Sequence, residues 1–144
     1  MIGLITLDEQ KRIFEKLVSY YENIHQGLKL ETAETTLSLE EIGNVYYTYQ
    51  GEAIEATQDI KVQLVASAVK RDYRTPVVIL RKEKENKDIL LDGHRRLIYA
   101  WSFGESWPAL IMKTAQEVEF GVEKTIRGKI KDLFRHKATT TDEV

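Results

Sequence analysis

Cysteine is absent from the 144-residue chain, and only 2 prolines occur. Without cysteine the chain can form no disulfide, no thiolate nucleophile and no cysteine-ligated metal cluster. Its three histidines lack the spacing of metal ligands, so zinc is not expected, and haem is not expected either. No apolar run reaches the roughly 20 residues that cross a bilayer, and the first residues lack the basic start of a secretory signal. We therefore expect a cytoplasmic protein without membrane contact.

The charge is small in total but unevenly distributed. Hydrophobic residues make up 42% and charged residues 31% of the chain, a composition typical of one soluble globular domain. Residues 1–60 hold 4 Lys and Arg against 11 Asp and Glu, whereas residues 61–144 hold 17 against 12. The second part favours an anionic ligand, although an imbalance of this size is also ordinary surface variation.

The most informative stretch covers residues 89–104. Residues 89–91 are an apolar run that predicts a buried strand, Asp92 and Gly93 predict a sharp turn, and residues 94–103 have helical spacing. The first amides of a helix that follows such a turn lack intrahelical partners and point out of the strand end. The junction therefore predicts an anion site, with Arg95 and Arg96 as phosphate ligands. Alternatively, Asp92 caps the helix and supplies the negative charge itself.

Residues 36–112 resemble the ParB/sulfiredoxin superfamily. The resemblance rests on residues 37–42, on the strand 75–80, on the Asp-Gly-His-Arg-Arg motif with Ala100 and Gly104, and on residues 107–112. It implies an α/β (α+β) fold, in which helices pack on a small mixed sheet. It also implies a nucleotide, namely ATP, ADP or CTP with Mg²⁺, whose phosphates lie on the glycine turn. His94 occupies the position of the sulfiredoxin cysteine, so that chemistry is excluded, and the motif is similar to that of archaeal free serine kinases.

The resemblance assigns roles to individual side chains. Glu52 would be a general base, and Asp92 would be a second base or the Mg²⁺ ligand. His94 would donate to a phosphate or take part in catalysis. Lys61 and Thr75 would complete the phosphate site formed by Gly93 and the two arginines. Each side chain also has a plainer interpretation, since loop acids, exposed lysines and turn histidines are commonly only solvated.

The implied function is nucleotide binding, with phosphoryl transfer to a small molecule or nucleotide hydrolysis as the more specific hypothesis. The alternative is a non-enzymatic DNA-binding, partition or regulatory module. It depends on a predicted C-terminal helix whose basic residues could contact DNA phosphates or simply be solvated. These residues are Lys124, Arg127, Lys129, Lys131 and Arg135.

Four segments are predicted along the chain. Residues 1–35 form an accessory helix and a polar linker, residues 36–113 the ParB/sulfiredoxin-like domain, residues 114–137 the basic amphipathic helix, and residues 138–144 a disordered tail. Inside the domain, residues 53–71 predict a helix, and the charged residues 82–88 are expected only to keep a strand connection solvated.

The accessory helix begins with a capping box formed by Thr6 and Glu9. Its apolar stripe is predicted to run through Ile13, Leu17, Tyr20/Tyr21 and Ile24. We expect this helix to pack on the sheet; the alternative is that the flanking helices mediate a homodimer.

Overall fold

The computed structural model describes residues 5–48 and 74–132. The strands are β1 (Glu31–Leu37), β2 (Tyr46–Thr48), β3 (Val77–Lys82), β4 (Lys87–Asp92), β5 (Trp107–Thr114) and β6 (Ile126–Lys129). The helices are α1 (Leu7–Ile24), α2 (Leu39–Gly43) and α4 (His94–Phe103), with short 3-10 turns η1 (Glu83–Glu85) and η2 (Val122–Thr125). The predicted helix 53–71, with Glu52 and Lys61 beside and within it, and Arg135 lie outside the described residues.

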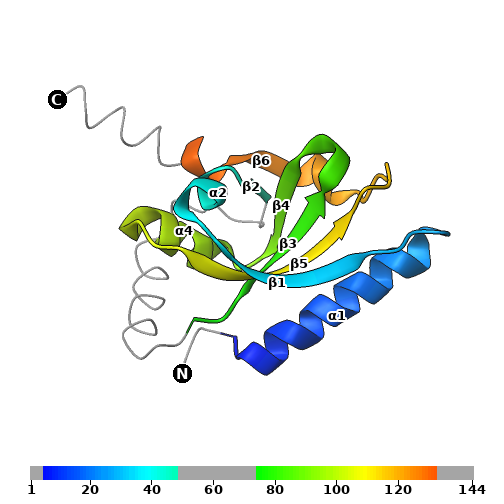
Figure 1. Cartoon of the computed structure of the whole chain (residues 1–144), viewed down its shortest axis with the longest axis horizontal. Coiled ribbons are helices and arrows are strands. Elements are labelled where there is room, and N and C mark those ends of the chain that lie inside the picture. The colour runs from blue at the N-terminus through cyan, green and yellow to red at the C-terminus, as the bar shows by residue number, and fades with distance from the viewer. Residues whose placement is uncertain (1–4, 49–73, 133–144) are drawn as a thin grey trace.

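The six strands form one mixed sheet in the order β1-β5-β3-β4-β2-β6 (Figure 1). The central strand β3 pairs in parallel with β5 and antiparallel with β4. Its first four residues, Val77–Leu80, have no exposed surface. A strand that is apolar on both faces must be covered on both faces, and the helices provide that cover. The predicted α/β class, with helices packed on a mixed sheet, is confirmed.

Two hydrophobic cores lie on opposite faces of this sheet. On one face, α1 places Phe14 and Tyr21 against a group of strand residues, which are Val78, Leu80, Ile89, Leu110 and Met112. On the other face, α2 and α4 bury Ile42 and Leu97 among residues that include Val77, Ile79, Trp107 and Ile111. Successive residues of β3 therefore alternate between the two cores, as the two-residue period of a strand requires.

Helix α1 begins with the predicted capping box, in which Thr6 and Glu9 bond each other's backbone amides. Its packing on the sheet is also as predicted. The buried stripe includes the predicted Tyr21, but Gln10 and Phe14 are buried in place of Ile13, and Ile24 is 50% exposed. In residues 5–48 and 74–132, no helix is both long and apolar enough to span a membrane.

The predicted linker before residue 36 is wrong for most of its length, because residues 31–37 form β1. This strand pairs with β5 over its whole length, from Glu31 opposite Lys113 to Leu37 opposite Trp107. It escaped prediction because its residues before Leu37 are polar or small and exposed, so they carry no apolar period. The short helix α2 after it has the expected second capping box, between Ser38 and Glu41.

The predicted helix over 115–136 is wrong up to residue 129. The chain there forms an irregular segment, η2 and β6, and helical structure begins only at Ile130. The four-residue apolar spacing resembles a helix, but Gly121 and Gly128 have positive φ angles of 93° and 154°, which a helix cannot accommodate. The backbone of β6 pairs instead with β2, so this segment belongs to the sheet.

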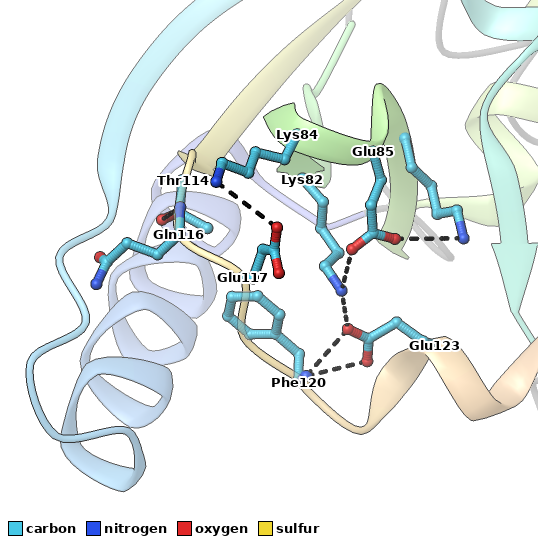
Figure 2. Close-up of polar contacts among 9 residues, drawn as sticks. Lys82, Lys84, Glu85, Thr114, Gln116, Glu117, Phe120 and Glu123 are labelled. Carbon is cyan, nitrogen blue, oxygen red and sulfur yellow. Dashed lines mark hydrogen bonds and ion pairs between the residues drawn. The ribbon is translucent and has the colours of Figure 1, made fainter.

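Lys82 is not a solvated loop lysine as predicted, because only 5% of its side chain is exposed. Figure 2 shows its ammonium group between two carboxylates, with Nζ 2.6 Å from Oε2 of Glu123 and 2.9 Å from Oε2 of Glu85. Both carboxylate oxygens of Glu123 also accept the backbone N–H of Phe120, at 3.0 Å. The ion pair therefore fixes the irregular segment after β5 against the β3–β4 hairpin.

The ion pair shifts both titrations toward the charged forms. Burial opposes the charge on each group and is the largest single effect on Lys82, but the hydrogen bonds and charges of Glu123 and Glu85 together outweigh it and raise the pKa of Lys82. The pKa of Glu123 is lowered, because the hydrogen bonds from Lys82 and from the Phe120 backbone outweigh the effect of burial. Both groups are therefore ionised at neutral pH.

We expect Glu123→Gln to destabilise the fold by about 1–3 kcal/mol, because it leaves the buried Lys82 ammonium with Glu85 as its remaining carboxylate. Glu117→Gln is the matched control, since it breaks an exposed ion pair with Lys84 and should change the free energy of unfolding little. Urea unfolding at neutral pH measures both variants. Equal losses in the two variants would contradict a buried clamp.

The same pair of proteins gives a pH test. The pKa of Glu123 in the folded state lies below its ordinary value of 4.5. The contribution of ionised Glu123 to the free energy of unfolding is therefore present above pH 4.5 and is lost as the pH falls through the folded-state pKa. The wild-type and Glu123→Gln proteins should therefore converge in stability in acid.

Candidate functional site

The candidate site is the turn between β4 and α4. Asp92 ends the strand, His94 begins the helix, and Gly93 joins them with φ 105° and ψ 30°. A Cβ atom at residue 93 would lie 2.5 Å from Cγ1 of Val77, so only glycine fits the close approach of this turn to β3. Among residues 5–48 and 74–132 no side chain caps α4, and the predicted Asp92 cap is therefore wrong. The amides of the first helical turn keep their positive potential for another partner.

Arg96 does not extend toward a ligand as predicted. It is 5% exposed, and its Nη1 donates to the carbonyl oxygens of Pro76 at 2.6 Å and of Thr75 at 3.2 Å. Its Nη2 lies 3.9 Å from Oδ2 of Asp92. The guanidinium group thus joins the start of β3 to the end of β4, which is a structural role at the site.

Thr75 also differs from its predicted role in phosphate binding. Its side-chain hydroxyl donates to the carbonyl oxygen of Ile5 at 2.9 Å. Its own carbonyl oxygen accepts from Arg96 and, at 2.9 Å, from Nε1 of Trp107. Thr75 is therefore a buried junction between the N-terminal segment, β3, α4 and β5.

Asp92 is held from the N-terminal helix. Nε2 of the fully buried Gln10 donates to Oδ2 of Asp92 at 2.9 Å, while 39% of the Asp92 side chain remains exposed. Sequence reasoning missed Gln10. The available signal was its position four residues before Phe14, which places a polar residue within a buried helical stripe.

His94 is buried against β2, with 6% of its surface exposed. The backbone N–H of Thr48 donates to its Nε2 at 3.2 Å, and the Thr48 hydroxyl lies at the same distance. Because Nε2 accepts, the proton of the neutral ring is on Nδ1. Within the described part of the chain, this buried Nδ1 has no hydrogen-bond partner.

The environment of His94 keeps the imidazole neutral. Burial lowers its pKa from 6.5 to about 4, and the positive charges of Arg96 and Arg95 add to this, while Asp92 opposes it. At physiological pH the ring is therefore an N–H donor at the first position of α4. It cannot be the general acid of a reaction near pH 7 unless a ligand raises its pKa.

The structure thus brings Asp92, Gly93, His94, Arg96 and Thr75 together around one turn. Arg95 lies at the same turn and is exposed. The five basic residues of the DNA-binding alternative do not share one helix face: Lys124 is in η2, Arg127 and Lys129 are in β6, and Lys131 follows β6. Lys129 in addition lies over the ring of Tyr46, at 5.4 Å from its centre.

In the described residues, no group of three or more acidic or histidine side chains could hold a metal ion. A magnesium ion at this turn would have Asp92 as its carboxylate ligand, together with phosphate oxygens and water. Comparisons of the chain with protein-family models, with curated proteins and with solved structures find no match.

We expect Gly93→Ala to destabilise the fold by about 2–4 kcal/mol, because it combines a strained positive φ with a clash against Val77. Gly104→Ala is the control at the other end of α4. Gly104 also has a positive φ, of 68°, but has open space around it, so about 1 kcal/mol is expected. Thermal and urea unfolding compare the two, and a cost at residue 93 no larger than that at residue 104 would contradict the close packing.

The lowered pKa of His94 predicts a pH dependence of stability. Between pH 6.5 and about pH 4 the unfolded chain binds a proton at His94 that the folded chain does not. The contribution of this group to the free energy of unfolding is therefore at its full value above pH 6.5 and decreases as the pH falls toward 4. For this group we expect a loss of about 2 kcal/mol at about pH 5 relative to about pH 7.5. The non-ionisable His94→Gln variant should lack this component in urea unfolding. Identical pH slopes would show that His94 is not buried in its neutral form.

Proposed function

We propose that the protein binds a nucleotide through its phosphates at the N-terminus of α4. The observation that carries this proposal is a set of hydrogen-bond donors around one turn. In the part of the chain that the structure describes, the first turn of α4 has no side-chain cap, and its first residue supplies the buried Nδ1–H of His94. Arg95 adds an exposed guanidinium at the next position. Uncapped helix amides with a cationic side chain are a common setting for phosphate.

The division of work between the two arginines differs from the one expected from the sequence. In this proposal Arg96 shapes the turn by bonding the carbonyl oxygens of Thr75 and Pro76, and Arg95 contacts the phosphate. Asp92, fixed by Gln10, would hold Mg²⁺ against the phosphate oxygens. Phosphoryl transfer or hydrolysis would additionally need a group that activates the attacking hydroxyl or water.

Thermal-shift measurements with ATP, ADP, CTP and GTP, each with and without Mg²⁺, test this proposal. Binding to the folded state alone raises the unfolding temperature in proportion to the logarithm of the ligand concentration. Arg95→Ala should weaken binding about 10-fold, because it removes a charge-assisted hydrogen bond. Lys84→Ala, at an exposed lysine of the β3–β4 hairpin, is the control and should have no effect.

Absence of any stabilisation at millimolar nucleotide, or equal weakening by both variants, would overturn the proposal. Lys82 is unsuitable as the control because its buried ion pair contributes to the fold. DNA binding remains a prediction from the sequence, since nothing in the arrangement of the described basic residues favours it.

A further inference from the structure

Strand β1 is an exposed edge of the sheet. Residues 31–36 are exposed, and in the described part of the chain no strand lies beyond them. Edge strands are commonly protected by lysine, proline or a bulge, because their outer N–H and C=O groups can pair with another chain. β1 has neither lysine nor proline, its charged residues are Glu31 and Glu34, and its register with β5 is continuous, whereas the β3–β4 and β2–β6 ladders both contain shifts.

We propose that β1 pairs with β1 of a second copy of this chain, antiparallel and centred on Ala33. A two-fold axis through Ala33 places Thr32 opposite Glu34 of the other copy, and Glu31 opposite Thr35. Each glutamate then faces a threonine, so this register places no like charges directly opposite each other. Centring on Glu34 would use all seven residues but would place the two Glu34 carboxylates directly opposite each other, which is destabilising.

The position of α2 also favours the Ala33 register over one centred on Thr35. α2 begins two residues after β1 and packs against it, so the C-terminal end of the strand is the more obstructed. The register centred on Ala33 uses residues 31–35 and leaves this end outside the pairing. Its two central threonine–glutamate pairs lie on the face that α1 covers, because Thr32 and Glu34 are opposite Met112 and Leu110 of β5.

A groove beside β1 supports the same occupant. A cavity of about 550 Å³ lies between α1 and β1, with Phe14, Val18 and Leu110 among its lining residues and Thr32 and Glu34 at its edge. The two-fold axis is perpendicular to the sheet, so the second copy places its own α1 on the same face. The two grooves then form one channel over the paired strands, and the partner's side chains cover part of its apolar lining.

The size of this interface predicts a weak dimer. Pairing of residues 31–35 buries less surface than the standard protein–protein interface, so association should depend on concentration. In sedimentation experiments we expect the mass to rise from 16.7 kDa toward twice that value as the concentration increases.

Disulfide trapping tests the register directly, because the natural chain contains no cysteine. Opposed residues of an antiparallel pair have Cα atoms about 4.5–5.5 Å apart, within the reach of a disulfide. Ala33→Cys should therefore give a covalent dimer under mild oxidation. In the same register, residue 35 of one copy lies opposite residue 31 of the other, so the two residues 35 are about 13 Å apart. Thr35→Cys should therefore give little covalent dimer. Asn23→Cys, exposed on α1, measures linking by random collision.

A charge substitution provides an independent test. Ala33→Glu places two carboxylates opposite each other and should keep the protein monomeric at concentrations at which the wild type dimerises. Asn23→Glu adds the same charge on α1 and should leave the dimer intact. The proposal is overturned if Ala33→Cys links no better than Thr35→Cys or Asn23→Cys, or if Ala33→Glu dimerises like the wild type. It is equally overturned if the wild type stays monomeric throughout.

Discussion

The hydrogen bonds from Arg96 to the carbonyl oxygens of Thr75 and Pro76 hold the centre of this molecule together. They fix the start of the central strand β3 to the first turn of α4, and Trp107 ties β5 to the same Thr75 carbonyl. A guanidinium group removed from water is costly unless its donors are satisfied, and here Nη1 donates to two backbone carbonyls while Nη2 lies near the carboxylate of Asp92. Because Gly93 allows the turn to approach Val77 closely, these elements meet without a gap.

The hydrogen bonds of Arg96 also determine which groups at the β4–α4 turn are available to bind a ligand. The arginine that looks like a ligand in the sequence is used by the fold, so ligand binding falls to exposed Arg95, to the helix amides and to the neutral ring of His94. The N-terminal helix is part of the same arrangement, because Gln10 holds Asp92 and Ile5 accepts from Thr75. A helix that the motif does not require therefore supports the motif's only acidic side chain.

Features that depend on neighbouring residues were predictable from the sequence, whereas features that depend on contacts distant in sequence were not. Helix α4 and both capping boxes were predictable because caps, glycine and periodicity act within a few residues. Strands β1 and β6 were not, because both exist through pairing with distant strands, and β6 even has helix-like apolar spacing. The burial of Arg96 and Lys82 could not be predicted, because the sequence does not show whether a charged side chain will find a backbone carbonyl or a distant carboxylate as its partner.

The order of the strands has a consequence for biosynthesis. β1 pairs with β5, which lies about 70 residues later in the sequence, and β2 pairs with β4 and β6, so both strands depend on partners that are made long after them. Contacts so distant in sequence slow folding. Until β5 has been made, the nascent chain exposes β1 without its partner strand, a state in which chaperones commonly protect newly made proteins.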